Sequence, residues 1–484
     1  MNPLVLKWKK ILFIMPNYRM EEANRFIQRI YPPIGLMYIA SYLKDLQVDV
    51  KIIDAKIENL TNKQLKDRIK EYNPDIVGIS VLVCSSINVC NDIAKMVKRI
   101  NKNITVVFGG RQPSMMPEKA LELEEVDMIV RGEGEITFRE LILNGSPIGV
   151  KGISYKSDGR IVHNPERELM KSLKNLRYPS RDLIKNNNYT LLGMKIDTIQ
   201  TSRGCPHRCR FCTTPVAMKG TWRPRPVDSI ITELKMISKN KKITDIIILD
   251  DNLTASTKRV EELCSKIIQC KKRGEMNDFK FYAQIRVDSI LKSPQMIKLM
   301  GEAGFWSVLI GIESVNDETL KDMNKRMSFN EVLEAIQTLH SYNISVFGSV
   351  IIGFDLNATE EEIMKEINYM KKIDVDILVL NLLTPYPGTP IYEEMEHRNL
   401  IVTKDWSKYT PFKPVYHTSH LSSKKLQDLL QYAFKHHAYH KNAVGFVSRM
   451  IKARGFSFVF NPKRIISTIF AVLKANLTLN KFFN

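Results

Sequence analysis

Three cysteines lie close together in the stretch TSRGCPHRCRFCTTP, residues 201 to 215. Cys205, Cys209 and Cys212 are separated by four and then by three positions. Thiolates bind zinc or iron–sulfur clusters, and a structural zinc site closes with four ligands, often as two distant pairs. No second pair of cysteines follows. Two alternatives remain: a zinc site in which His207 is the fourth ligand, and three free thiols that bind no metal. The spacing favours a cluster in which three irons bind cysteine and one iron keeps a position for a small ligand.

The chain around this loop alternates between strand and helix patterns from about residue 195 to 395. Six apolar runs of strand length are expected at 197–202, 243–249, 280–285, 307–313, 345–354 and 376–383. Helical periodicity between them predicts a partial (β/α)6 barrel of the TIM type, whose functional residues gather at the carboxyl ends of the strands. The polar or glycine residues at those ends are Asp250, Asp251, Asn252, Gln284, Arg286, Glu313, Ser314, Gly353 and Asp355.

An earlier alternating series occupies the first 145 residues. Near-continuous apolar runs at 10–17, 48–54, 75–83, 104–110 and 126–132 predict a Rossmann-like, doubly wound parallel sheet. Such sheets bind ligands beyond the carboxyl ends of their strands. The candidate residues there are Asp54, Ser80, Gly109, Gly110, Gly132 and Glu133. We therefore expect an α/β protein with domains at 1–145 and 191–400, a β-rich linker at 146–190, and a helical, basic region at 401–484.

Composition limits the setting of the protein. Seven cysteines in 484 residues, three of them clustered, favour a reducing compartment and a metal site over a disulfide scaffold. The amino terminus lacks a signal-peptide pattern, and the run 465–473 is too short to span a bilayer, which predicts a cytoplasmic protein. The net charge is +20, and no acidic residue follows Asp428. That basic, aromatic tail is interpreted as a helical cap, a peripheral contact with the anionic inner surface of a membrane, or, less favoured, a nucleic-acid contact.

The segment from Gly204 to Cys212, with Phe211 before the third cysteine, resembles the signature of the radical S-adenosylmethionine superfamily. The resemblance implies a [4Fe–4S] cluster whose open iron binds S-adenosylmethionine and yields a 5′-deoxyadenosyl radical. It further implies contacts to S-adenosylmethionine from Phe211, Asp250, Asp251, Asn252, Arg286, Glu313, Ser314 and Gly353. The acidic pair departs from the family's Gly-Gly-Glu pattern, and a helix cap is its alternative explanation. Structural ion pairs for Arg286 and Glu313, and strand packing for Gly353, are the corresponding alternatives.

The front domain resembles the cobalamin-binding domain that is fused to many of these enzymes. The matching pieces include DIVGIS, VVFGGRQPSMMPE and DMIVRGEGEITFREL. The resemblance implies that Ser80, Gly109, Gly110, Gly132 and Glu133 contact cobalamin. Where methionine-synthase-type domains carry a cobalt-binding histidine, this chain has Asp54-Ala55-Lys56-Ile57. A domain that has lost its cofactor therefore stays an alternative.

These features lead to three functional hypotheses. The first is methylation of an unactivated carbon in a lipid, tetrapyrrole or natural product. The second is radical oxidation or cyclisation, as in the anaerobic magnesium-protoporphyrin ester cyclase of this branch. The third, an RNA-modifying enzyme, is disfavoured because the front domain has only Cys84 and Cys90. The first two imply an electron donor such as flavodoxin or ferredoxin, and nucleic acid is not expected as a partner.

Overall fold

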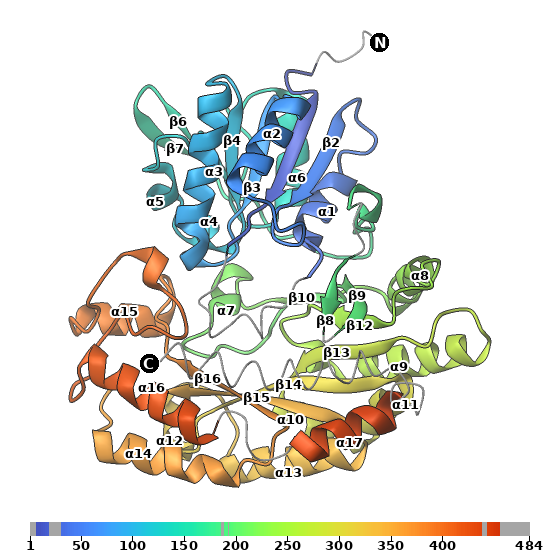
Figure 1. Cartoon of the computed structure of the whole chain (residues 1–484), viewed down its shortest axis with the longest axis vertical. Helices are drawn as coiled ribbons and strands as arrows, with labels where there is room; N and C mark the ends of the chain where they lie inside the picture. The colour runs from blue at the N-terminus through green and yellow to red at the C-terminus, as the bar shows by residue number, and fades with distance from the viewer. Residues whose placement is uncertain (1–5, 19–30, 185–187, 192, 438–442, 455–484) are drawn as a thin grey trace. The chain divides into compact units, whose positions relative to one another are not determined.

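The computed structural model describes residues 6–18, 31–184, 188–191, 193–437 and 443–454 (Figure 1). The chain divides into two compact units. The first contains residues 1–19 and 30–189, and the second contains residues 20–29 and 190–484. Each unit is built around its own seven-stranded sheet.

The first unit confirms the parallel sheet expected from the apolar runs. Its strand order is β2-β1-β3-β4-β5-β6-β7, and the first five of these are parallel. The bounds are β1 (Lys10–Met15), β2 (Asp49–Asp54), β3 (Ile76–Ser80), β4 (Thr105–Gly109), β5 (Met128–Val130), β6 (Ile153–Ser157) and β7 (Arg160–His163). β6 and β7 are antiparallel additions. The segment expected to be a linker thus extends the sheet.

Both faces of this sheet are covered, because its strands are apolar on both sides. In β1, Leu12 and Ile14 face a core shared with two helices, while Ile11 and Phe13 face the opposite core. The first face packs on α2 (Asn62–Tyr72) and α3 (Ile87–Ile100), and the second on α1 (Ile34–Ser41) and α6 (Gly134–Asn144). Two short helices, α4 (Arg111–Met115) and α5 (Pro117–Leu121), follow β4.

The second unit confirms the partial barrel. Its sheet has the order β16-β15-β14-β13-β12-β9-β8, in which all pairs but β8–β9 are parallel. The bounds are β8 (Thr190–Leu191), β9 (Met194–Ile199), β12 (Asp245–Ile248), β13 (Lys280–Ile285), β14 (Phe305–Glu313), β15 (Ser345–Ile352) and β16 (Ile377–Leu382). The curled sheet is not closed, and helices cover its outer face (Figure 1). They include α8 (Val227–Ile237), α9 (Thr257–Lys272), α11 (Pro294–Ala303), α13 (Phe329–Ser341) and α14 (Glu360–Tyr369).

The carboxyl-terminal region contributes α15 (Pro390–His397), α16 (Ser423–His437) and α17 (Ala443–Arg454). α17 packs against the amino ends of the barrel strands, where Phe446 and Met450 join Met194 and Trp306 in one buried cluster. Residues 455–484 of the predicted basic tail lie outside the described residues. Among the helices described, none has the length and apolarity that crossing a bilayer would require.

Two arginines fix α17 to the ends of strands. Arg449 donates to Asp376, which precedes β16, at 2.5 Å, and Arg454 donates to Asp245, the first residue of β12, at 2.5 Å. All four side chains are buried or nearly so. At least these two arginines of the basic tail therefore stabilise the fold through buried ion pairs and do not contribute to a charged surface.

Candidate functional site

The cysteine loop begins where β9 ends and is fixed on both sides. The short strand β10 (Ser202–Gly204) pairs with β11 (Trp222–Pro224), and α7 (Thr213–Ala217) starts directly after Cys212. Gly204 has a φ of +84°, and a Cβ there would lie 2.1 Å from the Thr221 carbonyl oxygen. Only glycine fits this crossing, which sets the direction in which the loop leaves the strand.

All three cysteines line one cavity of about 210 Å³ at the carboxyl ends of the barrel strands. Its other lining residues are His207, Phe211, Thr214, Pro215, Asp251, Gln284, Ile285, Arg286, Leu309, Gly311, Glu313, Lys325 and Ser349. The three thiols are free. Within the described ranges, no three Cys, His, Asp or Glu side chains are placed to share a single metal ion. Three cysteines in the lining of one cavity match the ligand number of a cluster in which each thiolate binds a different iron.

Some groups around the thiols stabilise the thiolate form, whereas burial opposes it. Burial raises the pKa of Cys205, whereas the backbone at His207 and the Arg286 guanidinium act to lower it. Asn252 Nδ2 lies 3.9 Å from Cys205 Sγ, and Arg286 Nη1 lies 3.9 Å from Cys209 Sγ. An amide donor and a cation beside the sulfurs are the groups that stabilise thiolates bound to a cluster. The donor set therefore fits a [4Fe–4S] cluster.

Asp250 has contacts other than those expected of it. It is 1% exposed and is not a lining residue of the cavity. Its carboxylate accepts hydrogen bonds from Thr201 N at 2.6 Å, from Thr201 Oγ1 at 2.5 Å and from Ser202 Oγ at 2.6 Å. Burial raises the pKa of Asp250, and these three donors oppose that effect. Asp250 therefore anchors the start of the cysteine loop, and Asp251 alone of the acidic pair faces the cavity.

The structure brings together four of the eight residues expected to contact S-adenosylmethionine. Phe211, Asp251, Arg286 and Glu313 line the cavity, and Asp250, Asn252, Ser314 and Gly353 do not.

The last three of these have other partners. Asn252 caps the short helix that follows it, and Ser314 Oγ donates to Glu366 at 3.5 Å. The Gly353 carbonyl accepts a hydrogen bond from Tyr416 Oη at 3.0 Å. Gly353 has a φ of +68°, and a Cβ added to it would lie 2.9 Å from Tyr416 Oη. For Gly353, close packing therefore describes the contacts better than an open ligand surface does.

Lys325 is a lining residue that sequence reasoning missed. Its ammonium lies 2.6 Å from Glu313 Oε1, and the side chains are 8% and 9% exposed. Lys325 lies in the turn after α12 (Asp317–Asp322), where no motif distinguishes it from the surface lysines around it. Only the fold places it in the cavity.

In the first unit, the five expected cobalamin residues lie at one edge of the sheet. Ser80 and Gly109 end β3 and β4, while Gly110, Gly132 and Glu133 follow β4 and β5. Gly110 has a φ of +116°, and a Cβ there would lie 2.5 Å from the Val81 carbonyl oxygen. Residue 110 must therefore lack a side chain. This leaves space at the carboxyl ends of the strands, where such a sheet binds its ligand.

A buried amide gives this edge a further feature. Gln112, which lies two residues after Gly110, is 4% exposed, and its Oε1 has no hydrogen-bond partner among the described residues. An acceptor left unpaired in the interior is costly, so a ligand that donates to it would be favoured. The edge therefore has a buried acceptor available to a polar cofactor such as cobalamin.

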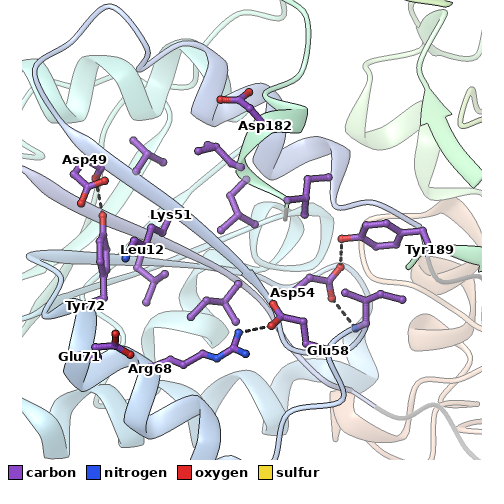
Figure 2. Close-up of a pocket in the computed structure, with 16 residues that line it drawn as sticks. Leu12, Asp49, Lys51, Asp54, Glu58, Arg68, Glu71, Tyr72, Asp182 and Tyr189 are labelled. Atoms are coloured by element: carbon purple, nitrogen blue, oxygen red, sulfur yellow. Dashed lines mark hydrogen bonds and ion pairs between the residues drawn. The ribbon is translucent and has the colours of Figure 1, made fainter. Parts of the chain in front are cut away.

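A second cavity, of about 490 Å³, runs along β2 in the first unit (Figure 2). Asp54 ends the strand there and accepts from Tyr189 Oη at 2.9 Å, Ile57 N at 3.1 Å and Lys56 N at 3.2 Å. Burial raises the pKa of Asp54. None of the five expected cobalamin residues lines this cavity. The stretch that lacks the histidine is thus held by internal hydrogen bonds.

Comparisons with known proteins agree with both halves of this description. Residues 26–142 match the B12 binding domain family, and residues 199–370 match the radical SAM superfamily. An uncharacterized methyltransferase of Pyrococcus horikoshii is 33% identical over 96% of this chain and 95% of its own length. The anaerobic magnesium-protoporphyrin IX monomethyl ester cyclase of Cereibacter sphaeroides is 26% identical over 87% of this chain and 68% of that protein. The hopanoid C-2 methylase of Rhodopseudomonas palustris is 25% identical over 82% and 72%.

Solved structures share the fold over nearly the whole chain. The cobalamin-dependent radical enzyme OxsB, with aqua-cobalamin and S-adenosylmethionine bound, has a TM-score of 0.69 at 19% identity, covering 95% of this chain and 72% of that one. The methyltransferase TsrM from Kitasatospora setae, with cobalamin and a [4Fe–4S] cluster bound, has a TM-score of 0.69 at 16% identity, covering 98% and 99%.

A three-cysteine loop on a partial barrel, joined to a B12-type sheet, defines a radical S-adenosylmethionine enzyme with a cobalamin-binding domain. The chain belongs to this family of B12-binding radical S-adenosylmethionine enzymes, whose cofactors are a [4Fe–4S] cluster, S-adenosylmethionine and cobalamin.

Proposed function

We propose that this enzyme methylates an unactivated carbon of a small-molecule substrate. The observation that carries the proposal is the placement of Cys205, Cys209 and Cys212 on the wall of a cavity that also holds Asp251 and Arg286. Relatives over most of the chain are named as methyltransferases or methylases, and others as cyclases. Methylation is favoured because a relative that is 33% identical over 96% of the chain is named a methyltransferase.

In this proposal the three cysteines hold the cluster, and the cavity beside them holds S-adenosylmethionine. When bound, the cofactors supply a 5′-deoxyadenosyl radical and a transferable methyl group. Asp251 accepts a hydrogen bond from Thr214 Oγ1 at 2.9 Å, which orients its carboxylate to accept from an ammonium group. Arg286 provides the matching cation for a carboxylate, and it is itself oriented by Asp288 at 3.0 Å. Asp251 and Arg286 thus place one negative and one positive group in the lining of the same cavity, as the ammonium and carboxylate groups of an amino acid require.

Part of the cavity lining is apolar. Phe211, Ile285 and Leu309 line it, and Phe211 packs edge-on against Phe354 at a centroid distance of 5.2 Å. A reactive radical is protected when its site excludes water and alternative hydrogen donors.

Cobalamin is assigned to the edge of the first sheet formed by Ser80, Gly109, Gly110, Gly132 and Glu133.

The test is anaerobic reconstitution of the full chain with iron, sulfide and cobalamin, followed by turnover with methyl-labelled S-adenosylmethionine. Formation of 5′-deoxyadenosine and transfer of the label to a product support methylation. Formation of 5′-deoxyadenosine without any labelled product would instead support the oxidative cyclase. A colourless protein that cleaves no S-adenosylmethionine would refute both.

The surroundings of the enzyme form part of the proposal. A flavodoxin or ferredoxin is the expected reductant, because the cluster must be reduced before each cleavage. The enzyme is expected in the cytoplasm, where thiols stay reduced. We further expect its basic tail to touch anionic membranes, where a large apolar substrate would be found. Flotation with anionic liposomes, comparing the full chain with one that ends at residue 454, tests that contact; equal flotation would remove it.

A further inference from the structure

A five-residue turn, Asp322 to Arg326, lies against the cysteine loop and is called here the 322–326 turn. The Arg210 N–H donates to the Met323 carbonyl at 3.3 Å, and Asn324 Nδ2 donates to the Arg208 carbonyl at 2.9 Å. The Asn324 carbonyl also lies 3.9 Å from Cys209 Sγ. These contacts all fall on the part of the loop between the first and third cysteines. The turn therefore forms the support on which that part of the loop rests.

The backbone of the turn directs one side chain inward. Asn324 and Arg326 have φ values of +57° and +54°, and Lys325 lies between them. Left-handed backbone bends the chain sharply, and asparagine adopts it more readily than most residues. The Lys325 side chain is consequently 8% exposed, although both of its neighbours in the chain are more accessible.

The Lys325 ammonium meets the Glu313 carboxylate at 2.6 Å inside the cavity. The ion pair lies directly over Gly311, where a Cβ would be 2.2 Å from Glu313 Oε1 and 2.6 Å from Lys325 Nζ. Glu313 itself has a φ of +65°, which is unusual for this residue type. Two local features thus accommodate the Lys325–Glu313 ion pair: residue 311 has no side chain, and residue 313 has a strained backbone conformation.

The same lysine is connected to the cluster side of the cavity through its backbone. Its carbonyl accepts from Arg286 Nη2 at 3.1 Å, and Arg286 Nη1 lies 3.9 Å from Cys209 Sγ. One residue therefore contacts both walls: its side chain fixes Glu313, and its backbone fixes the guanidinium beside the cysteine. Removing one partner of a buried ion pair leaves the other charge uncompensated, so Glu313 would move without Lys325.

We propose that Lys325 is a positioning residue, which holds the Glu313 carboxylate at a fixed place relative to the cysteine loop so that S-adenosylmethionine can bind. This inference rests on the proposed function. Its side chain acts through Glu313, and its backbone acts through Arg286. The loop contacts of the turn come from backbone atoms and Asn324, and they do not need the lysine ammonium.

The test compares Lys325→Met, Glu313→Gln and the double variant with the wild type, each as the reconstituted full chain. We expect Lys325→Met to keep its iron and sulfide content, to bind S-adenosylmethionine about tenfold to a hundredfold more weakly, and to melt at a lower temperature. The change that S-adenosylmethionine causes in the electron paramagnetic resonance spectrum of the reduced cluster should then require about tenfold to a hundredfold more S-adenosylmethionine than in the wild type. Lys321→Met is the matched control, because Lys321 is an exposed residue of α12; it should behave as wild type.

The double variant separates positioning from a merely structural role. Removing both charges should restore the melting temperature, because no unpaired charge remains, while S-adenosylmethionine binding should stay weak. Recovery of binding together with stability would overturn the inference, as would wild-type affinity in Lys325→Met. A wild-type protein that holds its cluster but shows no response to S-adenosylmethionine would refute the proposed function itself, before any variant is compared.

Discussion

Replacing Arg454 with methionine tests how α17 is held against the barrel. The Arg454 and Asp245 side chains are 6% and 4% exposed, and the arginine also lies 4.7 Å from the centroid of the Trp306 ring. Methionine keeps much of the apolar contact but leaves the Asp245 carboxylate buried without its cation. Removing one partner of such a pair costs about 3–5 kcal/mol. For a unit of this size, each kcal/mol lowers the melting temperature by about 2–4 °C.

We therefore expect the second unit of Arg454→Met to melt about 10 °C lower than wild type, measured by circular dichroism on protein in the same cofactor state. Adding Asp245→Asn should recover most of the loss, because the amide still accepts from Thr244 Oγ1, which donates to Asp245 at 2.7 Å. Lys452→Met is the control, since Lys452 is an exposed residue of the same helix. A melting temperature of Arg454→Met equal to that of Lys452→Met would refute the reasoning.

Three further predictions concern the site and the two sheets. Cys209→Ala should abolish the cluster absorbance and lower S-adenosylmethionine cleavage more than about a hundredfold, and a retained brown colour would contradict its role as a ligand. Burial and the nearby Asp355 raise the pKa of Glu366 from 4.5 to about 7, so folding binds a proton there. The second unit should lose roughly 3 kcal/mol of stability as the pH rises from 4.5 to about 7, and Glu366→Gln should remove this dependence from urea midpoints. Gly110→Ala places a Cβ 2.5 Å from the Val81 carbonyl oxygen and should cost at least about 2 kcal/mol in urea unfolding, together with loss of cobalamin retention on gel filtration.

Most strands and helices of both units are predictable from the sequence because their apolar residues recur with the period of the element. Parallel strands buried on both faces give continuous apolar runs, as in β3, where all five residues are buried. The β6–β7 hairpin lies in the segment predicted to be a β-rich linker, and its strands are short and half exposed, so the sequence does not show that they join the sheet. A local signal was present: Asp158 and Gly159, with φ values of +49° and +71°, form the Asp-Gly turn typical of two-residue hairpins.

The site was predictable only where its residues are neighbours in sequence. The spacing of the cysteines is local, and so are the strand ends that carry Asp251 and Arg286. The role of Asp250 depends on which way one carboxylate turns at a strand end, and adjacent acids in the sequence do not reveal this. Lys325 enters the cavity from a turn that only the packed barrel brings near Glu313, so no pattern in the chain could have indicated it.

The position of α17 has a consequence for the synthesis of the protein. Every strand of the barrel leaves the ribosome before residue 443, yet Met194 and Trp306 are covered only when Phe446 and Met450 pack onto them. Until then the nascent chain exposes these two apolar residues to solvent, and Asp245 and Asp376 lack their arginine partners. Chains that terminate early in this region should therefore be substrates for chaperones and proteases, even though all three cysteines of the proposed cluster site have already been made.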